Sequence, residues 1–172
     1  MSTTGIGQTI ELVVLSLWLG AALLVATSVT PAAFAVLPSR ALAGALVGRV
    51  LPVVFFGGII VAVIAVVCEM SLSMNAFSIR VSAPLIALAA GCAIAQFAIA
   101  PKIERIRIAV GRPIDGLDAA DPRRIEFGKL HAISVLWLGV AVLGAVVAIG
   151  MRVYSTNKPA ALVGASTTIR TL

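Results

Sequence analysis

The side chains in this sequence that could do chemistry are few and lie far apart. His131 is the single histidine, and Cys68 and Cys92 are the two cysteines. A histidine can ligate a haem, a chlorophyll-type pigment or a metal, which makes His131 the one candidate for a cofactor site. A lone histidine is explained more simply as a hydrogen-bonding residue at the start of a helix. We therefore expect no catalytic residues and no resident metal or other cofactor.

The cysteines and the acidic residues form no recognisable site. Cys68 and Cys92 lie in apolar stretches without C-x-x-C spacing, which predicts neither a zinc site nor a redox pair. Cys92 is expected to lie roughly 16 Å deeper in the membrane than Cys68, and a disulfide needs Cα atoms within about 7 Å. Residues 115–121 are rich in aspartate but lack the ligand pattern of a calcium loop.

The composition is that of an integral membrane protein. Of the 172 residues, 60% are apolar and 12% are charged, and the mean hydropathy is +1.12. Soluble domains carry about 25% charged residues. The net charge of +6 would suit a nucleic acid. However, the basic residues border apolar spans and alternate with acids, so we expect contact with lipid headgroups and not with nucleic acid.

Charged residues divide the chain into four apolar stretches, each of about the length that crosses a bilayer once. The predicted spans are about 12–36, 50–68, 81–101 and 129–151. Unpaired strands cannot cross a membrane, so the expected fold is all-α, an antiparallel four-helix bundle formed by residues 1–152. No charged residue falls at mid-depth, so buried ionisable groups are not expected. Residues 153–172 form a polar tail that we expect to dock on a partner protein.

Prolines and small residues indicate how the helices pack. Pro31 is expected to end or kink the first helix, so that this crossing runs from Leu12 to about Thr30 and an interfacial turn follows. The third span has small residues at a spacing of four, which let helix backbones approach closely in lipid. This predicted packing ridge consists of Ala83, Ala87, Gly91 and Ala95.

The charged segment of residues 102–128, predicted to form a loop between the third and fourth spans, sets the orientation. The side of the membrane that holds this segment has nine Lys and Arg residues, and the other side has four. The positive-inside rule therefore places residues 102–128 in the cytoplasm and both termini outside, in the inner membrane of a bacterium. Asp121 and Pro122 predict an N-cap and the first residue of the fourth helix. The basic residues expected to contact lipid headgroups or a partner are Arg49, Arg107, Arg123 and Arg124.

Motifs near the helix ends carry a resemblance to a known family. They include Trp18, Leu19 and Gly20; Pro31, Ala32, Ala33 and Phe34; Gly44, Arg49 and Pro52; Pro101, Ile103 and Arg107; and Phe127, Leu130, His131 and Ser134. Together they resemble the transmembrane-protein-205-like family (domain of unknown function 4149). The resemblance implies a small four-helix membrane protein, with distant relatives among copper-resistance-like membrane domains. The sequence departs from the family pattern at Trp137 and Leu138, where an asparagine would be expected.

Two functions fit these observations. The first is a non-enzymatic accessory or scaffold subunit of a larger bacterial membrane complex, respiratory or photosynthetic in kind, whose partners are other membrane subunits and the lipid bilayer. The second is a small transporter or metal-handling protein that uses the region of His131, and it requires a polar cavity reaching into the membrane. If a site exists, the matching residues predict it at the cytoplasmic ends of the helices, where Pro31, Phe34, Arg49, Pro101, Arg107 and His131 would converge.

Overall fold

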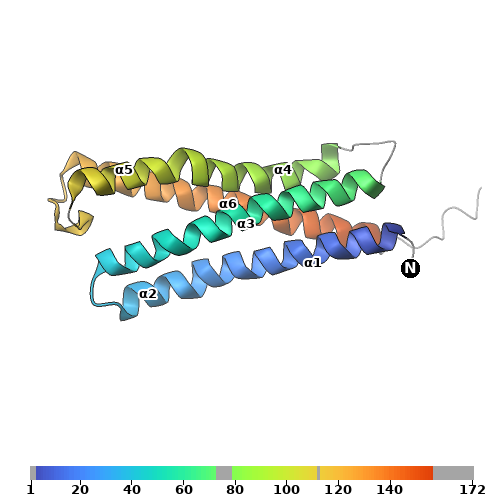
Figure 1. The fold of residues 1–172 in the computed structure, drawn as a ribbon, viewed down its shortest axis with the longest axis horizontal. Helices are drawn as coiled ribbons and strands as arrows, with labels where there is room; N and C mark the ends of the chain where they lie inside the picture. Colours follow the sequence, from blue (N-terminus) through green and yellow to red (C-terminus); the bar gives the residue numbers. More distant parts are fainter. Residues whose placement is uncertain (1–2, 73–78, 112, 157–172) are drawn as a thin grey trace, which may run out of the picture.

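The computed structural model describes residues 3–72, 79–111 and 113–156, and all of its regular elements are helical (Figure 1). The elements are α1 (Thr3–Leu24), η1 (Val25–Val29), α2 (Thr30–Val36), α3 (Arg40–Leu72), α4 (Ile79–Ala93), η2 (Ile94–Ile99), α5 (Ala100–Val110), η3 (Ile114–Gly116) and α6 (Pro122–Thr156). Within these residues, four continuous helices are long and apolar enough to cross a membrane. The prediction of a multi-pass, all-α membrane protein is therefore confirmed.

Each predicted span lies inside a longer helix. The four continuous helices are Gly5–Val36, Arg40–Met70, Ser82–Val110 and Pro122–Ser155. These helices run along the length of the molecule, and the first turns of α1 and the last turns of α6 lie at the same end (Figure 1). Charge keeps a residue out of hydrocarbon but does not end a helix, so the helices extend beyond the apolar stretches. The C-terminal tail beyond Thr156, with its proposed docking on a partner, lies outside the described residues.

Two of the prolines within the continuous helices each lie two residues after a wider turn. Pro31 follows the π-helical turn η1, and Pro101 follows the π-helical turn η2. A proline ring clashes with the carbonyl four residues earlier, and the i→i+5 pattern of a π-turn opens the helix at that point. The first crossing therefore does not end at Thr30 with an interfacial turn, as the sequence predicted. It continues to Val36.

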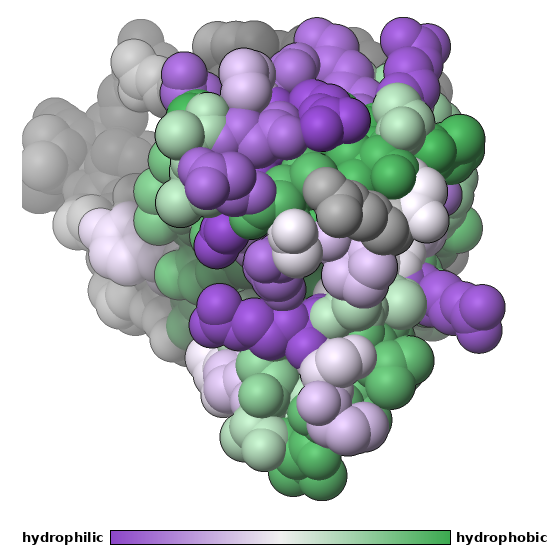
Figure 2. Space-filling model, turned by 90° about the vertical axis from the view of Figure 1, so that its left-hand side faces the viewer, coloured by the Kyte–Doolittle hydropathy of each residue, from purple (hydrophilic) through white to green (hydrophobic). Residues whose placement is uncertain are grey.

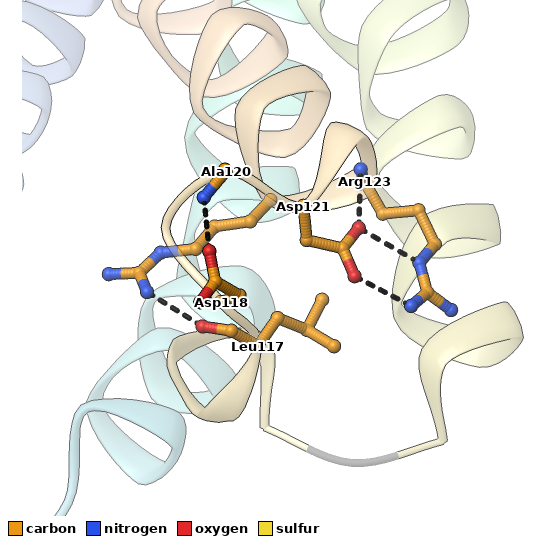
Figure 3. Close-up of polar contacts among 6 residues, drawn as sticks. Leu117, Asp118, Ala120, Asp121 and Arg123 are labelled. Carbon is orange, nitrogen blue, oxygen red and sulfur yellow. Dashed lines mark hydrogen bonds and ion pairs between the residues drawn. The ribbon is translucent and has the colours of Figure 1, made fainter.

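The charged segment of residues 102–128 is mostly helical, which corrects its prediction as a loop. The helix η2–α5 continues to Val110 and ends at Gly111, which has the left-handed conformation (φ 63°) that caps helices. The next helix starts at Pro122, where the carboxylate of Asp121 accepts a 2.9 Å hydrogen bond from the backbone N–H of Arg123 (Figure 3). The predicted N-cap is thus confirmed, and the true connection is short.

The backbones of α4 and α6 approach each other closely at two glycines. A Cβ on Gly91 would lie 2.7 Å from the carbonyl oxygen of Trp137, and a Cβ on Gly144 would lie 2.6 Å from that of Pro84. Of the predicted ridge, Gly91 and Ala95 are buried, Ala87 is half-buried beside Gly144 and Ala83 is exposed. Ala83 therefore lies outside the contact between α4 and α6. An α-helix has 3.6 residues per turn, so a strict spacing of four moves the first residue of the predicted ridge off the contact face.

Three charged side chains are buried at the end of the bundle that holds α1's first turns. They are Glu11 (1% exposed), Glu69 (8%) and Arg152 (9%), from α1, α3 and α6. Their burial corrects the expectation that the spans bury no ionisable group. The sequence placed all three at span boundaries, but the helices extend past those boundaries and turn these residues toward one another.

Candidate functional site

A cavity of about 780 Å³ lies at the opposite end of the molecule, between α3 and the helix pair η2–α5 and α6. α3 packs along α4 but diverges from α5, and this separation is visible at the end marked by α2 and α5 (Figure 1). Figure 2 looks onto this end, where hydrophilic residues gather around a hollow with hydrophobic residues beneath. The cavity has the size of a typical small-molecule pocket.

The wall of the cavity is mostly apolar, and most of its polar residues come from elements other than α3. α3 contributes Val47, Leu51 and Phe55, and α2 contributes Phe34. The polar and charged lining residues come mainly from the other elements: Arg40, Gln96, Glu104, Arg107, Asp115, His131 and Ser134. An apolar surface with a few polar groups is the usual make-up of a ligand pocket.

Arg107 spans the cavity mouth and connects three helices. Its Nη2 donates a 3.2 Å hydrogen bond to the carbonyl oxygen of Gly44 on α3, and its guanidinium lies 5.7 Å from the ring centre of Phe127 on α6. A carboxylate oxygen of Glu104 lies 3.8 Å from Nη1. A guanidinium has five N–H donors. Arg107 can therefore hold α3 at the mouth and still donate to a molecule in the cavity that it lines.

Two glycines on α3, one helical turn apart, leave the space that the Arg107 guanidinium occupies. A Cβ on Gly44 would lie 3.6 Å from Nη2 of Arg107, and a Cβ on Gly48 would lie 2.9 Å from Nη1. Larger residues here would push the side chain away from α3. The two glycines of the G-x-x-x-G motif at the start of α3 therefore pack against an arginine side chain and not against the backbone of a second helix.

The deeper polar group is Gln96, which belongs to the π-helical turn η2. Its Oε1 atom is buried and has no hydrogen-bond partner among the described residues, and Ser134 on α6 is buried along the same cavity. A buried amide oxygen without a partner costs free energy. Turns of π-helix within α-helices are frequent at functional sites. Gln96 is thus an acceptor available to a donor on a bound molecule.

The structure brings only some of the residues that the sequence singled out to the cavity. Of the six expected to converge, Phe34, Pro101, Arg107 and His131 line the cavity, whereas Pro31 and Arg49 are exposed and do not. His131 is itself exposed at the mouth. Further residues of the family resemblance also line it, namely Gly44, Pro52, Ile103, Phe127 and Ser134.

The two arginines before α6 are engaged within the connecting segment (Figure 3). Arg123 forms an ion pair with Asp121 at 2.7 Å, and Arg124 donates a 2.8 Å hydrogen bond to the carbonyl oxygen of Leu117. Asp118 accepts a hydrogen bond from the backbone N–H of Ala120. Contact of Arg49, Arg123 and Arg124 with lipid headgroups or a partner stays a prediction.

Metal ligation is not supported by a donor set. Among residues 3–72, 79–111 and 113–156, no group of three or more His, Cys, Asp or Glu side chains is placed to hold an ion. His131 shares the cavity with the carboxylates of Glu104 and Asp115, but these do not form such a group. The candidate site is therefore a cavity whose described lining holds no group of metal ligands.

Comparison with known proteins identifies the family. The model of a domain of unknown function, DUF4149, matches residues 13–110, which is more than half of the chain. The chain belongs to this family. No curated protein and no solved structure matches it. The DUF4149 region supplies α2, α3, η2 and α5, and hence most of the cavity wall, while α6 closes the cavity with Phe127, His131 and Ser134.

Proposed function

We propose that this DUF4149 protein binds a small amphiphilic molecule in the cavity, as a membrane carrier or binding protein. The apolar part of the ligand lies against Leu51 and Phe55, and a headgroup with acceptor atoms meets Arg107 and His131. The observation that carries this proposal is the combination of a mostly apolar cavity wall with charged groups at its mouth. This is a specific form of the transporter function expected from the sequence, without a metal.

The packing supports this function over a solid scaffold. The bundle is closely packed at Gly91, but it is open one and a half turns further on, where Gln96 lines the cavity. Helices that serve only as structure gain from filling such a space, since each lost contact lowers stability. The accessory-subunit function depended on a docked tail, on the absence of buried charge and on small-residue helix faces, which at Gly91 pack against α6 of the same chain. The tail is outside the described residues and buried charge is present, so no observation favours that function.

We further propose an antiparallel threading through a bacterial inner membrane, with the cavity mouth in the cytoplasm. The support is the excess of Lys and Arg around the connection between α5 and α6. The finer resemblance to the transmembrane-protein-205-like proteins belongs to the same proposal. It rests on Phe34, Arg107 and His131, three of its motif residues that line the cavity.

Filling the cavity should abolish binding. Leu51→Trp adds an aromatic ring to the apolar wall, and its matched control Val53→Trp adds the same ring on the same helix at a position 72% exposed. With decyl phosphate as the probe, native mass spectrometry should detect a one-to-one complex of the wild-type protein and of Val53→Trp, and about tenfold less complex for Leu51→Trp. Equal binding by the two tryptophan variants would contradict the proposal.

Side-specific labelling tests the orientation. Asp118→Cys and Thr9→Cys each place a thiol at an exposed position, one at each end of the molecule. A membrane-impermeant maleimide should label Thr9→Cys in intact cells and Asp118→Cys only after the membrane is opened. The unsubstituted protein measures the background from Cys68 and Cys92. Labelling in the reverse order would place the cavity mouth outside the cell.

A further inference from the structure

Glu11, Glu69 and Arg152 meet at the end of the bundle away from the cavity. The same nitrogen of Arg152, Nη2, lies 2.8 Å from Oε2 of Glu11 and also contacts Oε2 of Glu69. The two carboxyl groups therefore approach each other around a single guanidinium nitrogen. All three residues are at least nine-tenths buried, so water does little to screen them.

The charges in this cluster do not balance when every group is ionised. Two carboxylates face one guanidinium, and arginine stays protonated in proteins. Within three residues of the cluster on the same helices, the other described titratable or polar side chains are Gln8 and Thr9 on α1, Cys68 on α3, and Tyr154 and Ser155 on α6, and α4 adds the buried hydroxyl of Ser82. None of these supplies a second positive charge. The side chain of Arg80, at the start of α4, lies outside the described residues.

A single bound proton removes the imbalance. Two carboxylates that share a site repel each other strongly, and this repulsion is relieved when one of them takes up a proton. The remaining carboxylate then pairs one-to-one with Arg152, which is the neutral arrangement that a buried site favours. A metal cation would need several oxygen ligands, and it would be repelled by the guanidinium that already occupies the space between the carboxyl groups.

We infer that Glu11, Glu69 and Arg152 form a proton-binding site in which the two carboxyl groups share one proton at neutral pH. The proton comes from the aqueous phase beside the ends of α1, α3 and α6. This inference does not depend on the cavity ligand, because the cluster and the cavity lie at opposite ends of the bundle (Figure 1). A membrane protein with such a site can respond to the pH on one side of the membrane.

Infrared spectroscopy of the full-length protein in lipid nanodiscs at neutral pH tests the inference. The wild-type spectrum should contain the carbonyl stretch of one buried protonated carboxyl group, with the small downshift in D₂O typical of an acid proton. Glu11→Gln and Glu69→Gln should each lose this band, because the one remaining carboxyl group pairs with Arg152 and ionises. The control Glu104→Gln removes a carboxylate that is 60% exposed at the other end and should keep the band.

The outcomes separate the inference from its alternatives. A wild-type spectrum without the band would overturn the inference. This measurement does not depend on whether any variant folds. A band that persists in either single glutamine variant would show a proton that is not shared, and would also overturn it. Arg80→Gln should retain the wild-type band. If the band is instead absent from the wild type and appears in Arg80→Gln, then Arg80 balances the cluster and the charge count above is wrong.

Discussion

A single methyl group at Gly144 should destabilise the bundle by about 1–3 kcal/mol, the usual cost of overpacking a close-packed core. The Cβ of an alanine at this position would lie 2.6 Å from the carbonyl oxygen of Pro84 and 2.9 Å from the backbone nitrogen of Leu88. Both atoms belong to the backbone of α4, so no side chain can rotate to make room. The helices α4 and α6 must move apart, and their contact is the most extensive in the bundle.

Gly139 and Gly150 provide matched controls on the same helix. Neither has a neighbouring atom within 4 Å of an added Cβ. Because alanine favours a helix over glycine by up to about 1 kcal/mol, Gly139→Ala and Gly150→Ala should leave stability unchanged or raise it. The measurement is the free energy of unfolding in mixed micelles, compared across the three alanine variants. A Gly144→Ala protein as stable as Gly139→Ala would mean that α4 and α6 are not in backbone contact.

The fold was predictable because its main determinants are local. Four apolar stretches of membrane length dictate four helices, and Asp121 with Pro122 marks the start of the last one. The helix ends were predicted less well, because charge was taken as the end of each helix. Charge marks only where lipid gives way to water, so α5 continues to Val110 through residues that the sequence assigned to a loop, whereas the start of α6 at Pro122 was predicted.

The sequence predicted at which end of the bundle a site would lie, but not the contacts that form the cavity. Motif residues predicted the correct end of the bundle, and Phe34, Arg107 and His131 do meet there. The sequence did not reveal that the Arg107 guanidinium lies against Gly44 and Gly48, because that contact joins positions 63 residues apart. Nor did it distinguish Gln96 from other polar residues in the spans. Its importance depends on a π-helical turn caused by the following Pro101.

The buried charges were missed for a related reason, although a signal was present. Glu11, Glu69 and Arg152 each bound a span, and the predicted threading places all three at one end of the bundle. Two acids and one base at the same depth could have indicated a cluster. Counting lysines and arginines for orientation treats such residues as solvent-exposed, and that assumption failed here.

Removing the one positive charge of this cluster should have the largest effect of any single substitution. Arg152→Met keeps much of the volume of the side chain but leaves Glu11 and Glu69 buried together without a counter-charge. Breaking a buried ion pair by removing one partner costs about 3–5 kcal/mol. We therefore expect a loss of that size in the free energy of unfolding at neutral pH, and a smaller loss in acid, where both carboxyl groups are protonated.

The companion variants decide whether unpaired charge is the cause. Glu69→Gln leaves a one-to-one pair of Glu11 with Arg152, so it should cost much less than Arg152→Met. The triple variant Glu11→Gln, Glu69→Gln, Arg152→Met contains no charge and should recover most of the stability, because neutral replacement of a buried ionic cluster is often tolerated. This recovery appears as a coupling energy in the mutant cycle. If the triple variant is instead as unstable as Arg152→Met, then the arginine acts through its packing between α1, α3 and α6, and its charge is secondary.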